Sequence, residues 1–140
     1  MSTSVDVLNR LLKAEYGNVV NRLREADPFV SAASAEDRLL LDRMLADESA
    51  HERDLSETII ALRGTPAPRD YPTDVGGLHY LQLSFLMPQI IAAKRALVKV
   101  YESAGATGDP RADGLKNRIL ENHRRHLAEL ERMHANLASV

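Results

Sequence analysis

The stretch LADESAHERDL, residues 45–55, decides the fold, because it continues the apolar stripe of a long helix with two ionisable residues. On either side of it, apolar residues recur every three or four positions, which is the spacing of one face of an α-helix. Glu48 and His51 occupy the next positions of that face. The sequence therefore predicts a helix that turns a carboxylate and an imidazole towards its own core.

Composition limits the classes of protein to consider. The chain has 140 residues, which predicts one domain that can bury a core without disulfides. It contains no cysteine, so thiolate nucleophiles and thiolate metal sites are excluded. The net charge of -2, with both signs interspersed, argues against a nucleic-acid or membrane partner. Without a signal peptide or an apolar run of about 20 residues, the expected location is the cytoplasm.

Two helices are predicted in the first half of the chain. The first runs from Ser4 to Glu25 and stops before Pro28, because proline disfavours helical geometry in the residue before it. The second begins at Ser34, with Asp37 three residues on in the pattern of a capping box. It ends near Gly64, which we expect in the left-handed conformation common after a helix.

Two further helices are predicted in the second half. The third runs from Val75 to Ala104, is kinked or delayed by Pro88, and closes at Gly105. The fourth begins with Asp109 as cap and Pro110 as its first residue, and continues nearly to the end of the chain.

The connections between these helices indicate the topology. The link GTPAPRDYPTDVGG, residues 64–77, reaches roughly 45 Å when extended, enough to return along a whole helix. We therefore expect residues 1–140 to form one all-α four-helix bundle with a long crossover between the second and third helices, the ferritin-like arrangement. Two ordinary hairpins joined by a long flexible link remain an open alternative.

Ionisable residues interrupt the apolar stripe of every predicted helix. They are Glu15, Glu48, His51, Lys94, His123 and His126. In antiparallel hairpins, Glu15 and Glu48 lie equally far from one loop, and Lys94 and His123 from the other. DESAHERDL (47–55) and NHRRHLAEL (122–130) also align as a faint internal repeat that matches His51 with His126. The pattern predicts one shared polar layer across the bundle.

Charges in a core are costly unless they are paired or bound to a metal. Histidine and carboxylate side chains from facing helices are the ligands with which helix bundles bind non-haem metals. Glu48 and His51 are three residues apart, so both can reach one ion. The layer is therefore a candidate metal site.

The helices resemble those of the ferritin-like, rubrerythrin-type superfamily of bacterial proteins over essentially the whole chain. LNRLLKAEYGNVVNRL resembles the first helix with Glu15 as metal ligand, and DESAHERDL the second with its Glu-x-x-His pair. AAKRALVKVYESA resembles the third helix with Tyr101 at a tyrosine position, and NHRRHLAEL the fourth with His126 as ligand. The resemblance implies iron handling, or reduction of oxygen or peroxide, with a small oxidant as substrate.

Two residues depart from the pattern of that superfamily. Lys94 and His123 stand where the third and fourth helices usually supply glutamates. Two carboxylates balance one divalent ion rather than two, so we expect a single ion per chain: iron, or else manganese or zinc. The expected ligands are Glu15, Glu48, His51, His123 and His126.

Several alternatives stay open at this point. Lys94 is expected to be a salt-bridge partner, Tyr101 a hydrogen-bond donor into the layer, and His123 either a ligand or a partner of Glu15. A shift of the first stripe would turn Leu11 or Tyr16 inward instead of Glu15. The whole layer is alternatively a metal-free network in an interaction module, and enzymatic activity is undecided. The apolar segment LHYLQLSFLMPQIIAA, residues 78–93, suggests a homodimer.

Overall fold

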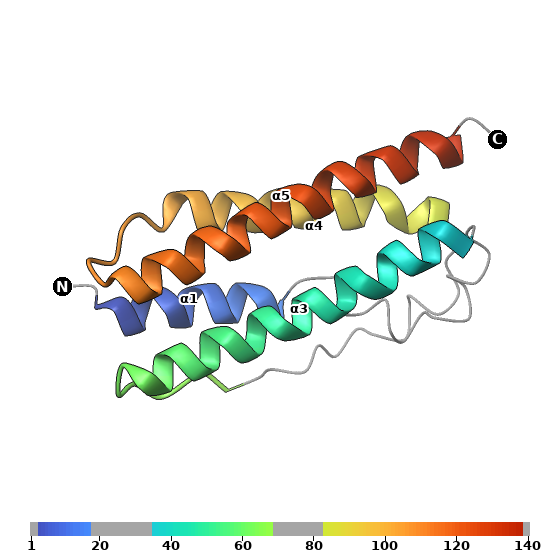
Figure 1. Ribbon diagram of the computed structural model, residues 1–140. Helices are drawn as coiled ribbons and strands as arrows, with labels where there is room; N and C mark the ends of the chain where they lie inside the picture. Colours follow the sequence, from blue (N-terminus) through green and yellow to red (C-terminus); the bar gives the residue numbers. More distant parts are fainter. Residues whose placement is uncertain (1–2, 18–34, 69–82, 139–140) are drawn as a thin grey trace.

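The computed structural model describes residues 3–17, 35–68 and 83–138. These contain four α-helices and no strand: α1 (Ser4–Tyr16), α3 (Ala35–Ala61), α4 (Leu83–Ser103) and α5 (Pro110–Ala138). The helices lie lengthwise against one another (Figure 1). The predicted all-α class with four helices is confirmed.

The helices pack as two pairs that face each other. α1 packs against α3, α4 packs against α5, and α3 also contacts α5 across the bundle. The members of each pair run in opposite directions, whereas α3 and α4 run in the same direction (Figure 1). None of the helices in the described part of the chain is long and apolar enough to cross a membrane.

The first helix begins at Ser4, as predicted, and its described part is shorter than the predicted helix. Thr3 and Asp6 form a capping box, because the Thr3 hydroxyl accepts from the Asp6 N–H and the Asp6 carboxylate accepts from the Thr3 N–H. α1 ends at Tyr16, whereas the sequence predicted a helix to Glu25. Residues 18–25 and the proposed cap Ser34 lie outside the described residues.

The end of α3 corrects one prediction. The left-handed residue is Arg63, with φ 64°, and not Gly64. The N–H groups of Arg63 and Gly64 close the helix by donating to the carbonyls of Ile60 and Ile59, at 2.9 and 2.8 Å. A glycine is nevertheless required at position 64, because a Cβ there would lie 2.5 Å from Cγ1 of Val5.

The α4–α5 turn forms as the sequence predicted. Gly105 has φ 72°, and the Asp109 carboxylate accepts from the Ala112 N–H at 2.9 Å with Pro110 as the first helical residue. Pro88 lies inside α4, so the helix is not delayed to that residue. Residues 75–82, where the helix was predicted to begin, lie outside the described part.

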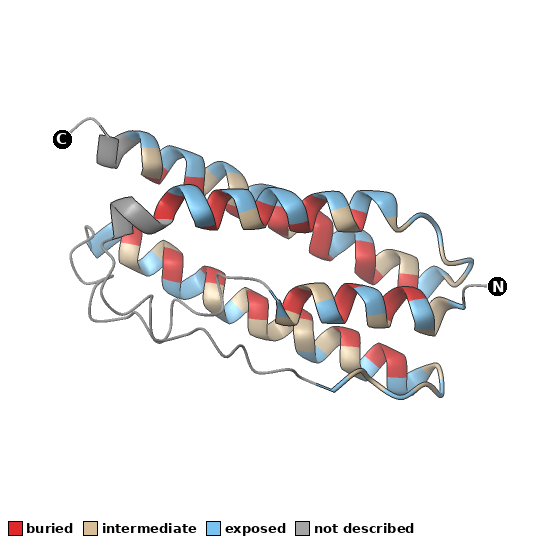
Figure 2. Cartoon of the chain, turned by 180° about the vertical axis from the view of Figure 1, so that it is seen from behind, coloured by how far each residue is buried: buried red, intermediate tan, exposed pale blue. Residues whose placement is uncertain are grey.

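The core has apolar ends and a polar middle. Buried positions face the interior of the bundle on every helix (Figure 2). The apolar ones include Leu8, Leu12, Leu41, Met44, Leu55, Ile59, Met87, Ile90, Leu97, Leu115, Ile119, Leu130 and Met133. Between them, at mid-bundle, lie the buried residues Glu15, Glu48, His51, Lys94, His123 and His126. The predicted polar layer is present, and Glu15 is buried together with Leu11 rather than in place of it.

Candidate metal centre

Lys94 is the centre of the polar layer. Its side chain projects from α4 and is 0% exposed. Its Nζ donates a hydrogen bond to Oε1 of Glu48 and lies 3.0 Å from Nδ1 of His123 and 3.1 Å from Nδ1 of His126. An ammonium has three donors and no acceptor, so these three partners use all of its hydrogens.

The position of Lys94 sets the tautomers of the two α5 histidines. Because Nδ1 of each ring accepts from the ammonium, each neutral imidazole carries its hydrogen on Nε2. Nε2 of His123 lies 2.6 Å from Oε1 of Glu15, and Nε2 of His126 lies 2.8 Å from Oδ2 of Asp47. Each histidine therefore connects the ammonium at the centre to a second carboxylate.

Tyr101 completes the contacts of Glu15. Its hydroxyl donates to Oε1 of Glu15 at 2.6 Å, and its ring meets that of His123 edge-on at 5.3 Å between centroids. In the structure, Tyr101 therefore hydrogen-bonds into the layer, Lys94 forms a salt bridge with Glu48, and His123 contacts Glu15.

His51 differs from the other histidines because its Nδ1 makes no hydrogen bond among the described residues. This nitrogen lies 3.7 Å from Oε1 of Glu15 and 3.8 Å from Oε2 of Glu48, beyond hydrogen-bonding distance for both. The ring is buried and packs edge-on against His123, at 4.7 Å between centroids. A buried imidazole nitrogen facing two carboxylates is suited to bind a cation.

Four side chains are close enough to share one metal ion. Each of Glu15, Glu48, His51 and His123 offers a ligand atom, and these atoms all lie within 4.8 Å of one another. Around a single ion with bonds of 2.0–2.2 Å, two ligand atoms are at most about 4.4 Å apart. The donor set therefore fits one ion after small side-chain movements.

His126 lies outside this group of four. Its two nitrogens face Lys94 and Asp47, and its Nδ1 lies 3.8 Å from Oε1 of Glu48. Asp47 was missed by sequence reasoning because it lies beside Glu48, off the buried stripe. The internal repeat contained a signal, since it aligns Asp47 with Asn122, and these side chains lie 3.4 Å apart.

Burial and neighbouring charges separate the pKa values of the two carboxylates. Burial, reinforced by the charge of Glu48, raises the pKa of Glu15 well above its ordinary value. Burial also acts to raise the pKa of Glu48, but His51 and the Lys94 charge outweigh it and lower that pKa. Glu48 is therefore the ionised partner of Lys94, and Glu15 holds a proton more tightly than Glu48 does.

The two α5 histidines are neutral. Burial, followed by the charge of Lys94, lowers the pKa of His123 to about 2 and that of His126 to about 4. Burial beside Glu15 also raises the pKa of Tyr101. The layer thus contains the ion pair of Lys94 and Glu48, with the two neutral α5 histidines beside it.

No protein-family model matches the sequence, and a search of well-characterised proteins finds no match. The interpretation of the layer therefore depends on its geometry and chemistry.

Proposed function

We propose that this protein binds one divalent transition-metal ion at the centre of its bundle, through Glu15, Glu48, His51 and His123. The observation that supports this most directly is the approach of four buried ligand atoms from three helices to within 4.8 Å of one another. Imidazole and carboxylate ligands together suit iron, manganese and zinc. Iron is the ion that the resemblance to rubrerythrin-type proteins favours.

The charges favour a single ion. One divalent ion is neutralised by Glu15 and Glu48, provided that Glu15 gives up its proton. A second ion would need the position of Lys94, whose Nζ contacts Glu48, His123 and His126. The site of a two-metal oxidase therefore does not fit these residues, and Lys94 competes with the single ion for Glu48.

The bundle is further proposed to be ferritin-like. The parallel direction of α3 and α4 supports this, because a chain that leaves one end of the bundle must return along it to start the next helix in the same direction (Figure 1). A redox-active ion bound in such a bundle would supply electron exchange with a small oxidant. The protein's own residues would bind this ion and limit the access of water to it.

A metal-free network is the second candidate, and one observation favours it. The three donors of Lys94 match three acceptors in the layer, so the network needs no ion to satisfy this lysine. In that case the polar layer would fix the register of the helices, and function would reside on the surface of the bundle.

Calorimetric titration with zinc or with anaerobic ferrous iron distinguishes the two candidates. We expect one binding event per chain in the wild type, and its loss in Glu48→Gln and in His51→Leu. Glu57→Gln and His134→Leu are matched controls, because they remove the same groups outside the layer from α3 and α5. Absence of binding to the wild type, with His51→Leu as stable as the wild type, would support the metal-free network instead.

A homodimer is also proposed from the apolar character of residues 78–93, although residues 78–82 lie outside the described part. Light scattering after size-exclusion chromatography tests it, and a mass of 15.5 kDa would contradict it.

A further inference from the structure

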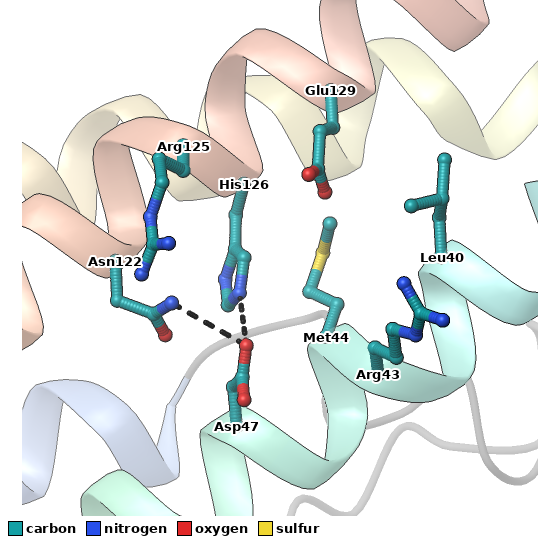
Figure 3. A pocket seen from close by; sticks show the side chains of 8 residues that line it. All are labelled: Leu40, Arg43, Met44, Asp47, Asn122, Arg125, His126 and Glu129. Carbon is teal, nitrogen blue, oxygen red and sulfur yellow. Dashed lines mark hydrogen bonds and ion pairs between the residues drawn. The ribbon is translucent and has the colours of Figure 1, made fainter.

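A pocket between α3 and α5 lies next to the polar layer. It has a volume of about 260 Å³, and its lining includes Met44 and Asp47 from α3 and Asn122, His126 and Glu129 from α5. Figure 3 shows the side chains of His126 and Asn122 meeting Asp47 across the gap between the two helices. The pocket is open to solvent, because the Asp47 side chain is 45% exposed.

His126 separates this pocket from the candidate metal ligands. Its side chain is 4% exposed, and its Nε2 faces Asp47 in the pocket at 2.8 Å. The opposite edge of the same ring faces the layer, with Nδ1 3.1 Å from Nζ of Lys94 and 3.8 Å from Oε1 of Glu48. The ring of His126 therefore contacts both the pocket and the layer.

Two other pockets in the described residues lack this connection. One is lined by α1 and residues 65–68, and includes Asn9 and Lys13. The other lies between α1 and α4 and is lined by small and apolar residues such as Ala14 and Ala93. Neither pocket is lined by any of the ionisable residues of the layer.

On the basis of the proposed metal site, we infer that the pocket between α3 and α5 is the entrance through which a divalent cation reaches Glu48, with Asp47 and His126 as its transient ligands. Asp47 offers an accessible carboxylate directly beside Glu48 in sequence. His126 contacts Asp47 through Nε2, and its Nδ1 lies 3.8 Å from Oε1 of Glu48, so this one ring reaches from the pocket to the proposed ligand. Carboxylate and imidazole are also the ligands of the final site, so the ion keeps the same types of ligand as it moves along this path.

Two arginine side chains oppose the attraction of a cation to Asp47. Arg43 and Arg125 also line the pocket, and both are exposed. Their charges are screened over about 8–10 Å at physiological ionic strength, whereas a cation coordinated by Asp47 is in direct contact with it. If the pocket is the entrance, the metal should enter more slowly when Asp47 is neutralised and faster when Arg125 is neutralised.

The rate of cobalt(II) binding tests the entrance. Stopped-flow absorbance under second-order conditions is compared for wild type, Asp47→Asn, Arg125→Gln and Asp42→Asn. Asp42 is exposed on α3 and does not line the pocket, so its variant is the matched control. We expect Asp47→Asn to bind about tenfold more slowly, a typical size for electrostatic steering. Arg125→Gln should bind faster, Asp42→Asn at the wild-type rate, and all variants should reach one ion per chain.

Each outcome separates the entrance from the metal site. If the wild type binds one ion and Asp47→Asn binds at the same rate as Asp42→Asn, the proposed entrance is wrong. The proposed metal site is then still supported. A wild type that binds no cobalt overturns both. If circular dichroism shows that Asp47→Asn is unfolded, Glu129→Gln takes its place, and a rate equal to that of the wild type is then the result against the entrance.

Discussion

Nζ of Lys94 lies 3.0 Å from Nδ1 of His123, in the middle of the residues proposed to bind a metal ion. The same nitrogen donates to Glu48, one of the four proposed ligands. The ammonium and a metal ion therefore compete for shared partners. Metal affinity in this protein should depend on how firmly Lys94 is held as well as on the ligands themselves.

Replacing Lys94 by methionine should have opposite effects on stability and on metal binding. It leaves Glu48 buried without its cation, so we expect the metal-free protein to lose about 3–5 kcal/mol of unfolding free energy. Zinc affinity should rise because the competitor is gone. Urea denaturation and calorimetry measure the two effects, with Lys99→Met as the control on the exposed side of α4. An unchanged or weaker zinc affinity would contradict the competition.

Metal binding should release protons. The raised pKa of Glu15 makes it hold its proton to a higher pH than an ordinary glutamate, and it has to lose this proton to act as an anionic ligand. Zinc titrations at pH 7 in buffers of different ionisation enthalpy should therefore show that protons are released when zinc binds. In Glu15→Gln, this release should decrease together with the affinity. Equal apparent enthalpies in all buffers would show that no proton leaves.

The metal-free protein should lose stability on acidification from pH 6 to pH 5. His123 and His126 have lowered pKa values, so they remain neutral in the folded state while they take up protons in the unfolded state below about pH 6.5. Glu15 has the opposite effect, because its raised pKa makes the folded state keep a proton that the unfolded state loses above pH 4.5. Two such effects opposed by one leave a net loss of stability as the pH falls from 6 to 5.

Replacing Glu15 by glutamine provides the test of that balance. Without the opposing carboxyl group, the loss of stability between pH 6 and pH 5 should become steeper. Urea denaturation at several pH values in the presence of a chelator measures both slopes. Parallel slopes for the wild type and the variant would mean that Glu15 is ionised in the folded protein.

Two glycine substitutions test the packing of the helices. In Gly64→Ala, the new Cβ would lie 2.5 Å from Val5, so α1 and the end of α3 have to move apart and stability should fall by about 1–3 kcal/mol. In Gly114→Ala, the nearest atom belongs to the flexible side chain of Arg118 at 3.6 Å, and stability should rise by about 0.8 kcal/mol through helix propensity. Thermal denaturation of the two variants should therefore give shifts of opposite sign.

Most of the fold could be predicted because helix caps and stripes are local signals. The side chain of Asp109 and the backbone preferences of Pro110 and Gly105 specify the α4–α5 turn locally, and the structure uses them as predicted. The left-handed residue at Arg63 could not be predicted, because the glycine beside it is needed for contact with Val5, a residue far away in sequence.

In the candidate site as well, the features set by local sequence could be predicted, and the contacts between distant residues could not. Helical periodicity was sufficient to predict which residues of each helix are buried in the layer. It could not predict which atoms meet, since the two nitrogens of His126 face Lys94 and Asp47 only when three helices pack together. Asp47 lies off the stripe and became visible only through its contact with His126.

The most direct test of the central claim is the metal content of the untagged protein, purified without chelator and then loaded anaerobically with ferrous iron. Inductively coupled plasma mass spectrometry should find one ion per chain, and none above background in Glu48→Gln or His51→Leu. Two ions per chain would show that Lys94 does not exclude a second metal. No bound ion in the wild type under any loading condition would contradict the claim, and the layer would then be a salt-bridged core.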